Sequence, residues 1–176
     1  MLRPLSLFLG LCVAGLAGCT GHPASPAQPE KTTIAAGEIG SRLPDFSVTD
    51  LQGHPLSSAD LRGKVVLIDF WATWCQPCKK EMPGYQKLLD RYGSGGLVVL
   101  GFKFDAMRDM EDPLQFAKKI GVRYPLAVAT EEVKQKFGGI EGLPTTMLYD
   151  RQGILRTKVV GFEYTEKFES ALEPLL

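Results

Sequence analysis

One stretch constrains the fold of this chain more than any other: an apolar run, two closely spaced cysteines and then an amphipathic segment. The run 64–70 contains no Gly or Pro and is rich in β-branched and large apolar residues, which predicts a buried strand. Apolar residues at helical spacing follow over 79–92. Cys75 and Cys78 therefore stand where a central strand ends and a helix begins.

This position has consequences for the chemistry of the two thiols. The first turn of a helix offers unpaired backbone N–H groups and the positive end of the helix dipole, which together stabilise a thiolate and lower its pKa. Cys75, at or just before the N-cap, is therefore predicted to be the attacking thiol. Cys78 lies three residues on and can resolve a mixed disulfide by closing an intramolecular one. Pro77 suits the first turn, where its missing N–H costs nothing.

Other uses of a cysteine pair remain as alternatives. A structural disulfide is one, and half of a zinc site is another, although zinc usually takes four ligands and this domain offers only the two cysteines and His54. A copper(I)-binding metallochaperone is chemically plausible because thiolates are soft ligands. A thiol peroxidase is the fourth alternative, although its cysteine is expected in a different local motif. The motif and its position favour redox activity of the cysteine pair, with no cofactor and no bound metal expected.

Charge excludes one large class of function. The chain has 20 Lys and Arg against 20 Asp and Glu, so its formal net charge is zero. The chain has neither a basic excess nor aromatic residues interleaved with arginines, so nothing in its sequence indicates a nucleic-acid partner.

The N-terminus has the features of an export signal. Residues 1–18 combine Arg3, a short apolar run and small residues, as in a signal peptide, and the run is too short to span a bilayer. Residues 16–19 resemble a bacterial lipobox, which implies cleavage before Cys19 and its lipidation, with Cys12 discarded. Ordinary cleavage nearby is the alternative and would leave Cys19 as a free thiol.

A change of composition separates this leader from the rest of the chain. Residues 19–38 are rich in Pro and Ala and show no periodic burial, so we expect a tether that spans about 60 Å when fully extended. The folded domain is predicted to occupy 39–176. The expected location is the cell envelope, with the domain lipid-anchored and facing the periplasm or the outer face of the cytoplasmic membrane.

The remaining segments alternate between strand and helix patterns. Strands are expected near 46–48, 55–57, 97–104, 124–129, 143–150 and 154–160, and helices near 58–61, 113–120, 131–137 and 164–176. Pro83 lies inside the predicted active-site helix and should bend it without ending it. This order predicts a three-layer α/β sandwich with a central mixed β-sheet.

This arrangement resembles the thioredoxin fold and, more narrowly, the TlpA/ResA-like thiol–disulfide oxidoreductases of bacterial envelopes. The resemblance covers about 39–176, and four segments carry it: 43–46, 66–83 with its W-C-Q-P-C motif, 142–146 with G-L-P-T-T, and 150–153. It implies an N-terminal extra β-hairpin and an insert before a cis-proline loop.

The resemblance also implies what the chain does. Members of this group reduce disulfides in partner proteins of the envelope through a cysteine pair equivalent to Cys75 and Cys78. Apocytochrome c is an expected client, in cytochrome c biogenesis. The expected electron source is a membrane protein of the DsbD or CcdA kind.

Two carboxylates near the cysteines are candidate proton carriers. Asp69 interrupts an apolar strand and shares a face with Trp71, so it is predicted to be buried, with a raised pKa, and to exchange protons with Cys78. Its alternative is a strand-end residue satisfied by local hydrogen bonds. Glu81 lies one turn after Cys78, where it either tunes the thiols or is solvated. Plain thioredoxins carry the first of these carboxylates and ResA-like members often the second, whereas this chain has both.

The predicted client-binding residues flank the cysteines. The resemblance implies a cis bond before Pro144, which would present the Leu143 backbone to an extended client segment and keep metals away. A trans proline at the start of a strand is the alternative. Trp74, Gln76 and Pro77 complete the predicted contact surface.

Overall fold

The computed structural model describes residues 35–104 and 111–176. The predicted signal peptide over 1–18 and the predicted lipidation site at Cys19 lie outside these residues, as does most of the predicted tether. Residues 33–176 form one compact unit. Among the described residues, no helix has the length and apolar character needed to cross a membrane.

A mixed five-stranded sheet forms the middle layer, in the order β5-β4-β3-β6-β7. Its strands are β3 (Val65–Trp71), β4 (Leu97–Phe104), β5 (Leu126–Ala129), β6 (Thr145–Tyr149) and β7 (Leu155–Val160). β3, β4 and β5 run parallel, whereas β6 runs antiparallel to both of its neighbours. Every residue of β3 is buried, as its unbroken apolar run predicts for a central strand.

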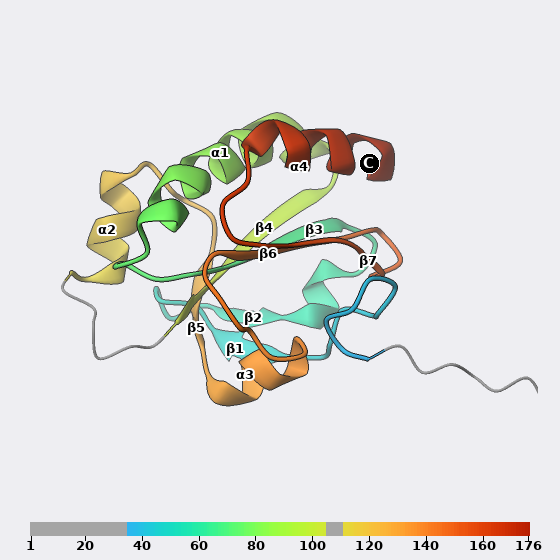
Figure 1. The fold of residues 1–176 in the computed structure, drawn as a ribbon, viewed down its shortest axis with the longest axis horizontal. Helices are drawn as coiled ribbons and strands as arrows, with labels where there is room; N and C mark the ends of the chain where they lie inside the picture. The colour runs from blue at the N-terminus through green and yellow to red at the C-terminus, as the bar shows by residue number, and fades with distance from the viewer. Residues whose placement is uncertain (1–34, 105–110) are drawn as a thin grey trace, which may run out of the picture. The chain divides into compact units, whose positions relative to one another are not determined.

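Helices and a small hairpin cover the two faces of this sheet (Figure 1). α1 (Gln76–Tyr92) and α4 (Thr165–Leu172) lie on one face, with α2 (Pro113–Lys119) beside α1. The hairpin of β1 (Ser47–Thr49) and β2 (Pro55–Ser57) lies on the other face with α3 (Glu131–Lys136). Short 3-10 turns complete the chain at Ser58–Leu61, Gly93–Gly95 and Glu173–Leu175. The predicted three-layer sandwich with its extra hairpin is confirmed.

The sheet divides the hydrophobic core into two clusters. The cluster under α1 and α4 includes Leu67, Trp71 and both cysteines, and the indole of Trp71 stacks on Phe116 with ring centroids 5.4 Å apart. The cluster on the opposite face is rich in phenylalanine; its rings belong to Phe46, Phe70, Phe102 and Phe137. Alternation along β3 sends successive side chains to these two clusters.

The helix α1 begins at the cysteine motif itself. Cys75 is its N-cap, Pro77 stands in its first turn, and the helix continues through Pro83 to Tyr92, as the sequence predicts. Gly84 lets α4 approach closely, because a Cβ at this position would lie 1.9 Å from Oγ1 of Thr165. The helix that carries the cysteines is therefore fixed from both sides, by the sheet and by α4.

Candidate active site

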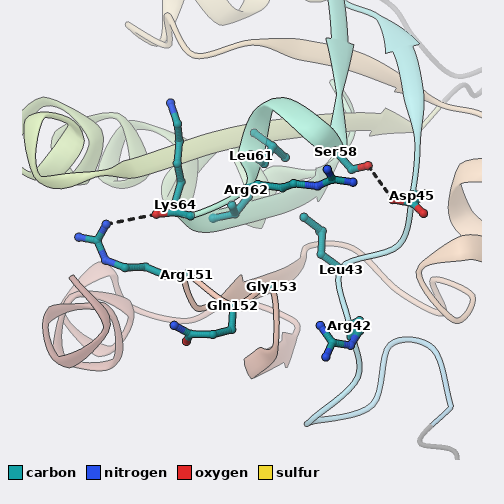
Figure 2. A pocket seen from close by; sticks show the side chains of 12 residues that line it. Arg42, Leu43, Asp45, Ser58, Leu61, Arg62, Lys64, Arg151, Gln152 and Gly153 are labelled. Atoms are coloured by element: carbon teal, nitrogen blue, oxygen red, sulfur yellow. Dashed lines mark hydrogen bonds between the residues drawn. The ribbon is translucent and has the colours of Figure 1, made fainter.

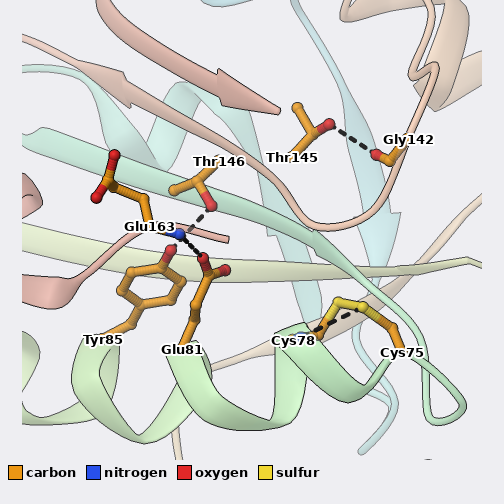
Figure 3. The surroundings of a disulfide bond; sticks show 8 residues. All are labelled: Cys75, Cys78, Glu81, Tyr85, Gly142, Thr145, Thr146 and Glu163. Atoms are coloured by element: carbon orange, nitrogen blue, oxygen red, sulfur yellow. Dashed lines mark hydrogen bonds between the residues drawn. A yellow bond between two sulfur atoms is a disulfide. The ribbon is translucent and has the colours of Figure 1, made fainter. Parts of the chain in front are cut away.

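The cysteine pair lies at the carboxyl end of β3 and the first turn of α1 (Figure 3). Cys75 and Cys78 form a disulfide, with Cα atoms 5.3 Å apart. The backbone N–H of Cys78 donates a hydrogen bond to Sγ of Cys75 at 3.3 Å. Cys75 keeps 4 % of its surface exposed and Cys78 none. Cys75, whose sulfur accepts this hydrogen bond at the helix N-terminus, is thus also the more exposed of the two cysteines.

A proline loop lies close to the disulfide. The peptide bond between Leu143 and Pro144 is cis, as the resemblance implies. The carbonyl of Pro144 accepts a hydrogen bond from the N–H of Gly161 at 2.8 Å, and the hydroxyl of Thr145 donates to the Gly142 carbonyl at 2.8 Å. Leu143 packs against the cluster that contains both cysteines. The loop is therefore fixed at both ends beside the redox centre (Figure 3).

Asp69 is fully buried on the face of β3 that carries Leu67 and Trp71. Neither carboxylate oxygen has a hydrogen-bond partner among the described residues. Burial raises the pKa of this carboxyl well above its usual range, and the nearby charge of Glu81 raises it further. The alternative of a strand-end carboxylate satisfied by local hydrogen bonds does not match this environment. Asp69 is therefore a buried carboxyl without a hydrogen-bond partner among the described residues, and it stays a candidate proton carrier.

Glu81 is also buried, with 2 % of its surface exposed. One oxygen, Oε1, accepts a hydrogen bond from the backbone N–H of Glu163 at 2.5 Å, and Oε2 has no partner in the described structure (Figure 3). Burial raises the pKa of this carboxyl to about 7, although the hydrogen bond from Glu163 acts to lower it. The burial of Glu81 contradicts the alternative of a solvated helix residue.

Two tyrosines that the sequence analysis did not single out complete this polar group. The hydroxyl of Tyr85 lies 3.0 Å from Oγ1 of Thr146, the residue that pairs with Asp69 across β3 and β6. The hydroxyl of Tyr124 is buried and unpaired in the described part of the chain. Burial raises the pKa of both phenols, and the charges of Asp69 and Glu81 add to this. Tyr85 lies four residues after Glu81, so helical periodicity alone could have placed it on the same face of α1. No local pattern predicts the position of Tyr124, which reaches this group because it lies just before β5.

Apolar side chains are exposed beside the cysteines and the proline loop. Trp74 is 40 % exposed, and the sequence-predicted neighbours Gln76 and Pro77 are exposed as well. Phe162 and Tyr164, in the segment between β7 and α4, are exposed and make an edge-on ring contact with centroids 5.2 Å apart. No sequence pattern marks this aromatic pair, because exposed aromatic residues between two elements carry no periodic signal.

The site has no recognisable set of metal ligands in residues 35–104 and 111–176, where no three His, Cys, Asp or Glu side chains gather as a metal would need. His54, the third ligand type considered from the sequence, lies in the β1–β2 turn with Nδ1 3.1 Å from Oδ2 of Asp50.

Comparison with known proteins places this geometry among redox proteins. The AhpC/TSA family matches residues 39–158. The thiol-disulfide oxidoreductase ResA of Geobacillus kaustophilus is 34 % identical over 146 residues, which is 83 % of this chain and 81 % of that protein. The protein of the same name from Bacillus thuringiensis is 32 % identical over 94 % of this chain and 91 % of its own. Among solved structures, a thiol:disulfide interchange protein of Chlorobium tepidum is 30 % identical, with a TM-score of 0.71 over 80 % of this chain and 99 % of that one.

Proposed function

This chain belongs to the AhpC/TSA family and is a thiol–disulfide oxidoreductase similar to the ResA proteins, and from this premise we propose how its own residues reduce a client disulfide. The observation that carries the proposal is the placement of the disulfide. Cys75 is the N-cap of α1, keeps a small part of its surface exposed and lies beside a cis-proline loop. Two buried carboxyls lie in the same layer of the fold.

The reaction begins with the reduced pair. The thiolate of Cys75, stabilised by the helix N-terminus and by the N–H of Cys78, attacks one sulfur of a client disulfide. A mixed disulfide forms between Cys75 and the client, and the other client sulfur leaves as a thiolate that takes a proton. Cys78 then attacks Sγ of Cys75, which closes the intramolecular disulfide and releases the second client thiolate. Two electrons pass from the cysteine pair to the client.

The two buried carboxyls manage the protons of this exchange. Cys78 is fully buried, so its thiol cannot lose its proton directly to bulk water. The ionised form of Asp69, a stronger base because burial raises the pKa of its carboxyl, accepts that proton as Cys78 attacks. Glu81, with a pKa near neutrality, exchanges protons with Asp69 and sets how strongly Asp69 holds them. This division of labour gives each of the two carboxyls a separate task.

The client binds along the cis-proline loop. An extended client segment pairs with the backbone of Leu143, while Trp74, Gln76 and Pro77 contact the residues around its disulfide. The cis bond at Pro144 and the exposure of Trp74 support this placement. Pro144 also occupies the approach to the sulfurs, which keeps metal ions from binding them.

The expected cellular setting follows from the N-terminal sequence. The chain is exported, cleaved before Cys19 and held by lipid at the outer face of a membrane. Its clients are envelope proteins with exposed disulfides, among them apocytochrome c, and its electrons come from a membrane donor of the DsbD or CcdA type. The lipobox-like residues 16–19 and the relationship to ResA proteins support this assignment.

The decisive experiment compares two single variants that differ only in which sulfur remains. Cys78→Ser should accumulate a mixed disulfide with a reducible protein client, because Cys75 attacks and nothing resolves the product. Cys75→Ser should accumulate none, since the fully buried Cys78 is out of reach. Equal trapping by both variants would overturn the assignment of Cys75 as the nucleophile.

A measurement of reduction potential tests the direction. If the protein works as a reductant, equilibration with dithiothreitol should give the Cys75–Cys78 disulfide a reduction potential near that of thioredoxin, roughly −270 mV. A value near roughly −120 mV would make the chain a disulfide donor instead.

A further inference from the structure

A cavity lies at the opposite end of β3 from the cysteines (Figure 2). It has a volume of about 260 Å³ and is bordered by Lys64, just before β3, and by the β6–β7 turn with Arg151. The disulfide follows the last residue of β3, Trp71. At about 3.3 Å per residue, the length of β3 separates the cavity from the redox centre by about 20 Å.

The cavity is surrounded by positive charge. Four basic residues line it, namely Arg42, Arg62, Lys64 and Arg151, against the single carboxylate of Asp45. All four are exposed. The whole chain has a formal net charge of zero, so this is a local concentration and not a reflection of a basic protein.

These cations are available to a ligand. Within residues 35–104 and 111–176, no acidic side chain forms a salt bridge with Arg42, Arg62 or Lys64. Arg151 is held in place by two backbone carbonyls, those of Gly63 at 3.2 Å and Gly95 at 2.9 Å. Carbonyl partners leave its positive charge uncompensated. Guanidinium and ammonium groups without acidic partners around one concavity are suited to a phosphate group.

The cavity also adjoins the N-terminal approach to the domain. Residues 40–43 are fixed to the β6–β7 hairpin through three backbone hydrogen bonds: Gly40 N–H to the Leu155 carbonyl at 2.9 Å, Leu155 N–H to the Ser41 carbonyl at 2.8 Å, and Leu43 N–H to the Gly153 carbonyl at 2.7 Å. Arg42, within this segment, lines the cavity. The chain upstream contains the predicted lipidation site at Cys19.

We propose that this cavity binds the phosphate of an anionic phospholipid headgroup and so holds the domain on the bilayer with the cysteines facing away from it. Charge complementarity and the position beside residues 40–43 carry the assignment. Each basic residue close to an anionic membrane surface strengthens binding about fivefold, and the effect is screened by salt. Such a site sets the orientation of the domain on the bilayer.

The test uses residues 33–176, a compact unit that contains both core clusters of the fold and therefore folds without the leader. Its sedimentation with vesicles of phosphatidylcholine containing phosphatidylglycerol is compared with its sedimentation with phosphatidylcholine alone. Replacement of both Arg62 and Lys64 by Gln should weaken binding to the anionic vesicles by roughly tenfold or more. The matched control replaces two exposed lysines outside the cavity, Lys87→Gln with Lys118→Gln, for the same change in net charge.

Three outcomes would overturn the proposal. One is equal binding to both kinds of vesicle, and another is an equal loss in the cavity variant and in the control. The third is binding of free glycerol phosphate, measured by calorimetry, without binding to vesicles; this would make the ligand a soluble anion. None of these measurements uses the cysteines, so a negative result leaves the oxidoreductase function untouched.

Discussion

The two faces of β3 are built from the same strand but serve different purposes. On the face under the β1–β2 hairpin and α3, Val66, Ile68 and Phe70 join a cluster of phenylalanine rings. On the face under α1, Asp69 stands between Leu67 and Trp71, and four residues present buried polar atoms without partners among those described: Asp69, Trp71, Glu81 and Tyr124.

The phenylalanine face stabilises the fold, whereas the unpartnered polar atoms on the face under α1 destabilise it. A buried polar atom without a partner costs on the order of 1–3 kcal/mol, so natural cores seldom contain several together. Here they gather next to the disulfide, in the layer where protons must move during thiol exchange. The phenylalanine face offsets that cost through apolar burial and ring contacts. Separate substitutions on the two faces should therefore affect stability and rate independently.

The largest effect on stability is expected on the phenylalanine face. Phe102→Ala should lower the free energy of unfolding by about 3–5 kcal/mol, because the ring is fully buried against three other phenylalanines. Urea denaturation measures this change. The milder Phe102→Leu keeps enough folded protein to compare exchange rates, and its rate per folded molecule should match the parent. A slowed rate in that variant would contradict the separation of the two faces.

The largest effect on rate is expected from Asp69→Asn. Loss of the proton acceptor should slow the resolving step by about 10²-fold or more. Because the pKa of Asp69 is raised by burial, its ionised form destabilises the folded state, so Asn should leave stability at pH 8 unchanged or higher. Stopped-flow measurement of exchange between pH 5 and 9 should show a flattened pH dependence. A parent-like profile would remove Asp69 from the mechanism.

Glu81→Gln should have a pH-dependent effect on stability. The pKa of Glu81 is about 7 in the folded protein, above the ordinary value of 4.5. The contribution of protonated Glu81 to the free energy of unfolding is therefore fully present below pH 4.5 and is lost as the pH rises through 7. Gln keeps an oxygen for the N–H of Glu163 but never ionises. The variant should match the parent near pH 4 and exceed it by about 1–3 kcal/mol at pH 8, as measured by urea denaturation. An equal difference at both pH values would point to packing, not ionisation.

The smallest effect is expected from Tyr124→Phe. The hydroxyl is buried and has no hydrogen-bond partner in the described structure, so its removal should change the free energy of unfolding by less than about 1 kcal/mol, with a gain as the expected sign. Tyr85→Phe is the matched control, because its hydroxyl contacts Thr146 and its loss should destabilise. The opposite ranking of these two variants would show that Tyr124 has a polar partner.

Much of the fold followed from local patterns. The apolar run before Cys75 predicted a buried central strand, and the capping position of the cysteine predicted the start of α1, because both depend on neighbouring residues alone. The hairpin turn at 150–153 and the terminal helix were predicted on the same basis. The cis bond at Pro144 was expected only through family resemblance, since the sequence around a proline does not by itself select the isomer.

Local sequence patterns identify the groups that could react: a cysteine pair at a helix N-terminus, with two carboxylates at strand and helix spacings that direct them toward it. Packing of the whole chain was needed to bury Glu81 near the Asp69 that the strand pattern already predicts to be buried, to bring Tyr124 to them, and to gather basic residues from 42 to 151 around one cavity. The physical reason is that burial and proximity between distant segments depend on how strands and helices pack. A residue's chemistry is local, whereas the environment that sets its pKa is assembled from the whole fold.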